Sequence, residues 1–144
     1  MRKSIPTLAM LLIATTALAH GGVKNPAVLA RMDLMVDVGD AMKVLGEMAK
    51  GAQPFDTQQA DRARGALIVA SNQVIARFEA EENDPKSEAL PTIWSDWAGF
   101  NASAEDMAQA AESLDTSTLD GLRAGIGALG KSCGSCHESY RIKK

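Results

Sequence analysis

Apolar residues recur every three or four positions along most of the chain beyond residue 25. This spacing is the period of an amphipathic α-helix rather than that of a β-strand. The first stretch predicts a helix over 26–50, because an asparagine N-cap and a proline open it and Gly51 follows its last residue. A second helix should begin near Asp56 and end before the turn signal at 83–85.

The stretch from 85 to about 101 is rich in residues that form turns, and it also holds two tryptophans. We interpret it as a long crossover loop rather than as another helix. Ser103 then opens a third, shorter helix, and Ser117-Thr118 caps a fourth that runs to about residue 140. Four such helices predict an all-α fold, an antiparallel four-helix bundle. The apolar residues of the last helix alternate by three and four, as in a heptad: Leu119, Leu122, Ile126, Leu129, Cys133, Cys136 and Tyr140.

The chain begins with a targeting pattern. Two basic residues at 2–3 precede an apolar stretch over 8–17 and the small-x-small sequence at 17–19. This order is typical of a cleavable secretory signal peptide, so we expect one over 1–19, followed by a single mature domain over 20–144. The apolar stretch is much shorter than the roughly 20 residues that a membrane-spanning helix needs. The prediction is a periplasmic protein that is not embedded in the membrane.

The composition and charge of the chain exclude several classes of protein. The chain has 144 residues, with 15 Lys+Arg against 18 Asp+Glu and a net charge of −3. A near-balanced charge excludes a polybasic nucleic-acid binder and a disordered acidic tail, both of which need a strong excess of one sign. No set of residues suggests a general acid, a general base or an activated nucleophile, so we do not expect an enzyme.

Both cysteines fall in one pentapeptide, Cys133-Gly134-Ser135-Cys136-His137. Covalent attachment of haem c needs two thiols about one helical turn apart, which add to the two vinyl groups, and a histidine directly after the second thiol to bind iron. The pentapeptide supplies all three groups. We therefore predict covalently bound haem c, held by Cys133 and Cys136 and ligated by His137.

Three alternatives use the same residues. A structural zinc site requires four ligands, but besides the two cysteines the mature chain contains only two histidines, His137 and the terminal His20. A redox dithiol should open a helix beside a strand, where the helix dipole lowers the thiol pKa, whereas this motif falls in the last turns of a helix. A disulfide between the two cysteines would strain that helix and close almost no loop.

The chain resembles class II cytochromes c, the cytochrome c-prime family, in which the haem motif ends the last helix. The segment 133–141 carries the resemblance most specifically, together with the signal peptide and the four predicted helices. Further similarities are Gly46, Lys50-Gly51, Pro54-Phe55-Asp56, Ile93-Trp94-Ser95 and Phe100. The resemblance covers the mature chain and implies a haem with His137 as the fifth ligand of its iron.

The sixth ligand position separates two branches of this family. In high-spin members it is vacant, and small gases such as nitric oxide bind there; in low-spin members a methionine of the first helix fills it. Matching the first helix by its landmarks places Met35 at this position, four residues after Arg31. The resemblance to the low-spin branch implies ligation by His137 and Met35 and a single-electron carrier. The alternatives are that Met35 only packs in the core, which leaves a gas-binding site, or that Met32 is the ligand.

The resemblance also implies that Arg31 pairs with a haem propionate, the alternative being a solvated arginine on the helix face. Basic residues gather near the haem motif, where they could steer an acidic redox partner or complement the end of the helix: Lys131, Arg141, Lys143 and Lys144. The acidic run over 79–88 should be a solvated loop. We expect soluble or membrane redox partners, and either a monomer or a homodimer, since high-spin relatives often pair through their first two helices.

Overall fold

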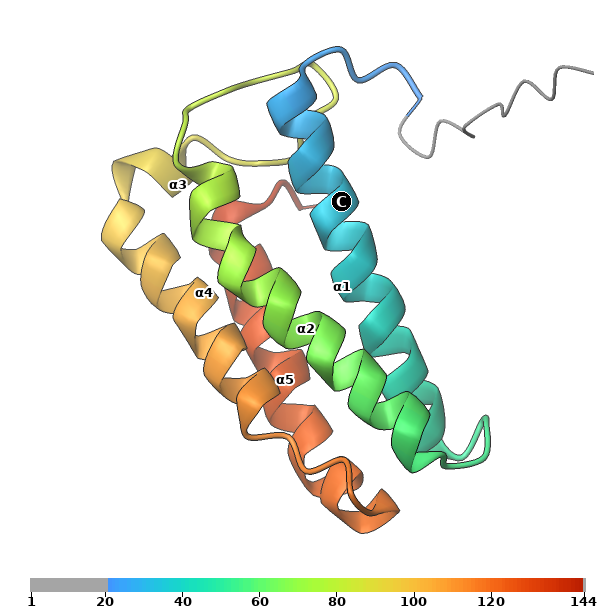
Figure 1. Ribbon diagram of the computed structural model, residues 1–144. Coiled ribbons are helices and arrows are strands. Elements are labelled where there is room, and N and C mark those ends of the chain that lie inside the picture. The colour runs from blue at the N-terminus through green and yellow to red at the C-terminus, as the bar shows by residue number, and fades with distance from the viewer. Residues whose placement is uncertain (1–20, 144) are drawn as a thin grey trace, which may run out of the picture.

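A computed structural model describes residues 21–143, and these residues form five α-helices (Figure 1). The helices are α1 (Pro26–Lys50), α2 (Thr57–Phe78), α3 (Thr92–Ser95), α4 (Trp97–Glu112) and α5 (Leu119–Tyr140). The predicted signal peptide, together with His20 and Lys144, lies outside the described residues. Within 21–143, no helix has the length and apolar content that a membrane crossing requires.

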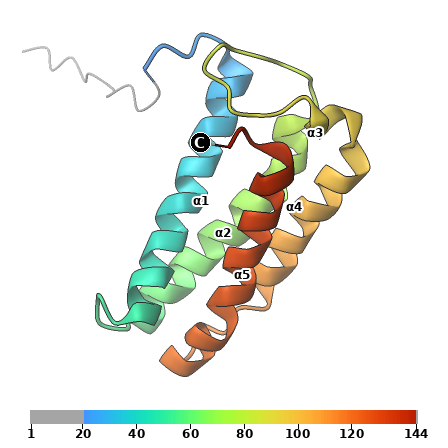
Figure 2. The same ribbon diagram turned by 180° about the vertical axis from the view of Figure 1, so that it is seen from behind.

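The four long helices form an antiparallel bundle. Around the bundle, α1 packs on α2, α2 on α4, α4 on α5 and α5 on α1, and the view from behind shows α5 lying between α1 and α4 (Figure 2). The predicted all-α four-helix bundle is therefore confirmed. The largest fully buried side chains come from α1, α2, α3 and α5: Val28, Leu45, Met48, Leu67, Ile93, Leu122 and Leu129. Each of these contributes about 1.5–3 kcal/mol by leaving water.

The ends of α1 and α5 follow the capping signals in the sequence. The Asn25 side chain accepts hydrogen bonds from the backbone N–H groups of Ala27 (2.9 Å) and Val28 (3.1 Å). Gly51 ends α1 in the left-handed conformation with φ 75°, which glycine adopts without a steric penalty. The Thr118 side chain accepts from the backbone N–H of Gly121 at the start of α5. The predicted limits of these two helices are confirmed.

The predicted crossover loop is wrong over 92–101. Residues Thr92–Ser95 form the short helix α3, and α4 begins at Trp97, six residues before the predicted start at Ser103. Asp96 caps α4 by accepting from the backbone N–H of Gly99 at 3.3 Å. Gly99 lies in the first turn of α4, where only a residue without a side chain fits, since a Cβ there would lie 2.6 Å from the Tyr140 hydroxyl.

The connection over 79–91 is tied to the start of α1 and to the end of α5. Asp84 is 7% exposed, and its carboxylate accepts from the backbone N–H groups of Lys24 (2.8 Å), Asn25 (3.0 Å) and Lys86 (2.9 Å). On the other side, the backbone N–H of Leu90 donates to the carbonyl of Tyr140 at 3.0 Å. The acidic run is therefore not a purely solvated loop, since Asp84 is buried and anchors the start of α1.

Asp84→Asn is expected to lower the melting temperature at neutral pH, and the loss should shrink in acid. The three N–H donors, led by that of Lys86, lower the pKa of Asp84 in the folded state. A lowered folded pKa gives stability that is present above the unfolded value, about 3.9, and is lost as the pH falls through the folded pKa. Thermal unfolding of both proteins between pH 3 and 7 measures this. A gap that stays constant over that range would contradict the prediction, and Asp106→Asn on exposed α4 surface is the control.

Candidate functional site

One cavity gathers every site residue predicted from the sequence. It has a volume of about 630 Å³ and is walled by side chains of all five helices and by loop residues 87–89. Its lining residues come from the half of the bundle where α1 begins and α5 ends, two helix ends that lie near each other in Figure 2. Its volume is within the range of about 300–1,000 Å³ that is usual for small-molecule and cofactor sites. The predicted residues that line it are Arg31, Met35, Cys133, Cys136 and His137.

The α5 wall carries the two thiols and the imidazole. Cys133 and Cys136 are three residues apart, so the helix presents both on one face, and both are half-buried and free of a disulfide. His137 follows at the exposed rim of the cavity. The two thiols and the imidazole of the pentapeptide therefore line one cavity.

Burial sets the protonation of these groups. It raises the pKa of the Cys133 thiol and of the Cys136 thiol, and the proximity of Cys133 adds to the rise at Cys136. The pKa of His137 is lowered, first by partial burial and then by the charge of Arg141, against a smaller opposite effect of Glu88. The thiols are therefore protonated at neutral pH, and the imidazole is held toward its neutral form, which is the form that ligates a metal.

The alternatives to haem find less support in this arrangement. Among residues 21–143, no three or more His, Cys, Asp or Glu side chains come together as a metal site would require, so a zinc ion has no ligand set there. A reactive dithiol needs a lowered thiol pKa, usually at the start of a helix, whereas both thiols lie near the end of α5 with raised pKa values.

The α1 wall presents thioethers to the same cavity. Met32, Met35 and Met42 line it, whereas Met48 is 0% exposed and lies in the hydrophobic core. A further methionine, Met107 of α4, also lines the cavity and was not among the predicted site residues. The helical spacing places it on the inward face of its helix, but that spacing does not show that the inward face borders the cavity.

The remaining walls leave room for a flat cofactor. Gly39 of α1 and Gly130 of α5 both line the cavity, and a Cβ at either would meet nothing within 4 Å. An aromatic cluster closes one end: Phe100 lies 5.1 Å from Phe78 and 5.4 Å from Tyr140, measured between ring centroids. The Tyr140 hydroxyl donates to the Asp96 carboxylate at 2.7 Å, which raises the pKa of Tyr140 to about 12. Paired thiols, an imidazole, a thioether and apolar walls fit haem c.

The structure overturns one of the two interpretations of Arg31. It lines the cavity but is only 3% exposed, so the solvated alternative is wrong. Its guanidinium donates to the backbone carbonyls of Arg77, Ala80 and Glu82, at and beyond the end of α2. Pairing with a haem propionate stays a prediction, and it would have to share the guanidinium with these carbonyls.

An ion pair borders the exposed rim near His137. Arg141 donates twice to the Glu88 carboxylate, at 2.8 and 2.5 Å, and the backbone N–H of Ile142 donates to the Glu88 carbonyl at 2.8 Å. Lys143 lies 3.8 Å from the carboxylate of Glu138. Two of the predicted basic residues are thus paired with carboxylates, which reduces the positive charge that a partner would meet.

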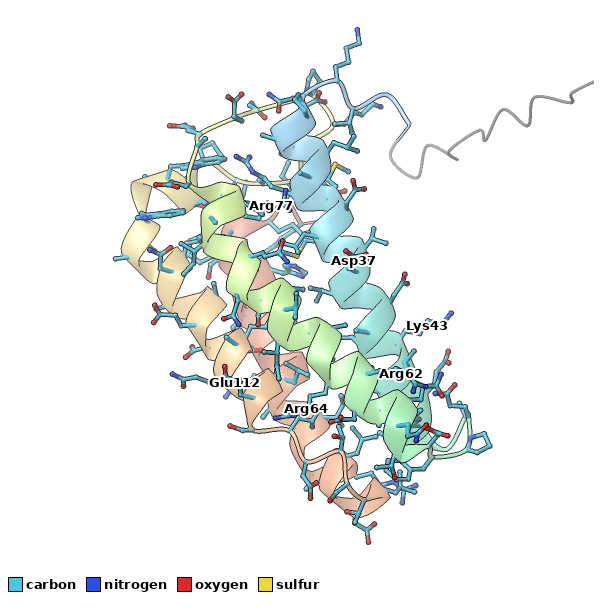
Figure 3. The ribbon with its side chains drawn as sticks, in the orientation of Figure 1. Asp37, Lys43, Arg62, Arg64, Arg77 and Glu112 are labelled. Atoms are coloured by element: carbon cyan, nitrogen blue, oxygen red, sulfur yellow. The ribbon has the colours of Figure 1, made fainter. Side chains whose placement is uncertain are left out.

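A second hollow, of about 770 Å³, lies on the outer face of α1 and α2. Acidic residues of α1 and basic residues of α2 line it, among them Asp37, Arg62 and Arg77 (Figure 3). It contains none of the predicted site residues.

The sequence as a whole matches one known family, described as Cytochrome C', over residues 26–141. The chain belongs to the cytochrome c' family. It is 32% identical over 130 residues to cytochrome c-556 of Agrobacterium tumefaciens (strain apple 185), covering 88% of this chain and 99% of that relative. The structure of cytochrome c' from Rhodobacter Spheriodes matches with a TM-score of 0.76 and 26% identity, over 82% of this chain and 96% of that one.

Another similar structure is a nitric oxide complex of a variant of cytochrome c prime from Alcaligenes xylosoxidans. It has a TM-score of 0.74 and 30% identity, and the match covers 82% of this chain and 94% of that one. As a cytochrome c' family member, the chain is a haem-binding c-type cytochrome with covalently attached haem c, which confirms the predicted cofactor. The roles of the individual residues around the haem stay predictions.

Proposed function

We propose that this protein is a single-electron carrier in which Cys133 and Cys136 hold haem c covalently and His137 and Met35 ligate its iron. When bound, haem c supplies a one-electron couple between ferric and ferrous iron. The observation that carries the proposal is that the Met35 thioether and the His137 imidazole line the same cavity, from α1 and α5 respectively.

The protein's own residues give such a carrier what it needs. A thioether ligand favours ferrous iron and raises the reduction potential relative to two histidines. The apolar walls, with Phe78, Phe100 and Met107 among them, limit the access of water to the site. His137 stands at the exposed rim, so one edge of the site is open to a redox partner.

Gas binding is the second candidate function. It is favoured by similar proteins that were solved with gases bound: cytochrome c prime variants from Alcaligenes xylosoxidans, 30% identical to this chain, in complex with nitric oxide and with carbon monoxide. In that case Met35 packs against the cavity wall without binding iron.

The setting that we propose is the periplasm, reached through the signal peptide over 1–19, with soluble or membrane redox proteins as partners. We assign no catalytic role to any residue. The only titratable side chains at the cavity besides the thiols are His137, Tyr140, Glu88 and the two arginines, and Glu88 and Arg141 neutralise each other.

Optical spectra of protein expressed in the periplasm separate the two functions. The electron carrier is expected to show low-spin spectra in both oxidation states, a weak charge-transfer band from thioether to iron, and no response of the reduced protein to carbon monoxide. Prompt carbon monoxide binding by high-spin ferrous protein would instead establish the gas-binding function.

A further inference from the structure

Three arginines of the bundle each donate side-chain hydrogen bonds to backbone carbonyls at or near the end of a neighbouring helix. Arg123 of α5 donates to the carbonyl of Ala49 near the end of α1, and Arg64 of α2 donates to the carbonyls of Ala111 and Glu112 at the end of α4. Figure 3 shows Arg64 beside Glu112 at that end of the bundle. Arg31 of α1 does the same for α2, where the last carbonyls of a helix lack partners and carry partial negative charge.

Arg31 differs from the other two in being buried. It is 3% exposed and lines the haem cavity, whereas Arg123 is exposed and the Arg64 side chain is 28% exposed. Its Nε donates to the carbonyl of Arg77 and its Nη1 to that of Glu82, both at 2.8 Å, and its Nη2 donates to the carbonyl of Ala80. The guanidinium carbon lies 5.0 Å from the Phe78 ring centroid and 5.3 Å from that of Trp94.

The contacts of Arg31 are therefore carbonyl dipoles and the faces of aromatic rings. Burial lowers the pKa of Arg31, and the charge of Glu82 works in the opposite direction. The Glu82 carboxylate accepts a hydrogen bond from the Asn25 side chain at 2.8 Å. A guanidinium keeps its proton throughout the physiological range, so the wall of the cavity contains a permanent positive charge.

We propose that Arg31, held by backbone carbonyls at and beyond the end of α2, raises the reduction potential of the protein. A fixed positive charge in a poorly solvated wall favours the state of the site that carries one more electron, because water and salt screen it only weakly. The electron comes from an external one-electron donor, and no proton moves on Arg31. The use of this effect rests on the proposed electron-transfer function. The change in reduction potential itself does not, because Arg31 acts in the same direction whichever group is the sixth ligand.

The test compares haem-loaded Arg31→Gln with haem-loaded Arg64→Gln. Arg64→Gln is a matched control, because it also removes one arginine that donates to the last carbonyls of a neighbouring helix, but Arg64 does not line the cavity. Reductive titration with mediators gives the ratio of reduced to oxidised protein at a fixed ambient potential. We expect Arg31→Gln to lower this ratio about tenfold, which corresponds to about 59 mV for one electron. Arg64→Gln should leave it within about twofold, because the charge it removes is partly solvated.

Two further variants keep the proposal falsifiable. Arg31→Lys retains the charge but cannot reach three carbonyls, so it should keep most of the potential while lowering the melting temperature. Arg31→Met, which can pack on the same aromatic rings, replaces Arg31→Gln if the latter does not fold. A shift in Arg31→Gln no larger than in Arg64→Gln would overturn the proposal, and so would an equal fall in Arg31→Lys.

The pH dependence tests whether the charge is permanent. If the charge of Arg31 is permanent, the difference between wild type and Arg31→Gln stays constant from pH 5 to 8. A difference that varies with pH over this range would mean that a titrating group sets the charge of the cavity wall, and it would overturn the assignment. Carbon monoxide spectra of each protein are recorded in parallel, so that failure of the proposed ligation is seen separately from failure of the role of Arg31.

Discussion

Replacing both cysteines, Cys133→Ser with Cys136→Ser, is expected to abolish covalent haem attachment, so that all haem is extracted from the denatured polypeptide. A serine hydroxyl does not form the bond that each thiol makes with a vinyl group. Both cysteines line the cavity on one face of α5, so each single variant should retain haem through one bond. Haem staining of the denatured chain and its intact mass measure the result.

The same double variant should lose its native packing. At about 24 cal/mol per Å³, an empty cavity of 630 Å³ would cost up to about 15 kcal/mol, which is as large as the whole stability of an ordinary domain. Water entering the cavity lowers that figure, but we still expect helical far-UV dichroism with weak near-UV signals. Ser135→Ala, within the same motif, is the control and should retain haem. Covalent haem in the double variant would contradict the assignment.

The elements that the sequence predicted well are those set by local signals. The asparagine cap and Gly51 bound α1, and Thr118 caps α5, because a cap acts within one turn of the residue that supplies it. The heptad of α5 was readable for the same reason. Its apolar side chains are buried or half-buried, with Cys133 and Cys136 continuing the seam.

The elements that were missed depend on contacts distant in sequence. Around Trp97 the prolines, tryptophans and glycine favoured a loop by local rules. The α4 helix nevertheless begins there, because Asp96 both caps it and accepts the hydrogen bond of Tyr140, a residue of the last helix. Gly99 fits beneath that hydroxyl. No local pattern could reveal this requirement.

The candidate site also combines features that local sequence predicts with features that depend on distant contacts. Cys133, Cys136 and His137 are adjacent in the sequence, so their chemistry was readable before their surroundings were known. The carbonyl partners of Arg31 and the place of Met107 in the cavity wall were not, because both depend on residues of other helices. Burial of a charged side chain against carbonyl groups is decided by how helices pack, which the order of residues does not display.

Met35→Leu is expected to convert the protein from low spin to high spin, with loss of the charge-transfer band and prompt binding of carbon monoxide by the reduced form. Leucine and methionine differ little in volume, so the exchange usually costs less than about 1.5 kcal/mol and the bundle should stay folded. The change therefore isolates the sulfur atom. The reduction potential should also fall, because a thioether ligand favours ferrous iron.

The other methionines of α1 supply matched controls. Met32→Leu and Met42→Leu alter the same cavity wall, whereas Met48→Leu alters the hydrophobic core. All three should remain low spin. A change of spin state in Met32→Leu, with none in Met35→Leu, would transfer the ligand to Met32.

A wild-type protein that is already high spin would leave Met35 as a packing residue, and the gas-binding function would follow. The structure allows either position of the Met35 side chain. Gly39 follows Met35 by one helical turn, also lines the cavity, and leaves open space beside α1. A methionine beside such space can either extend toward iron or lie along the wall, since its unbranched chain adapts to both. The two outcomes differ by one bond to sulfur, and that bond determines whether the site carries electrons or admits gases.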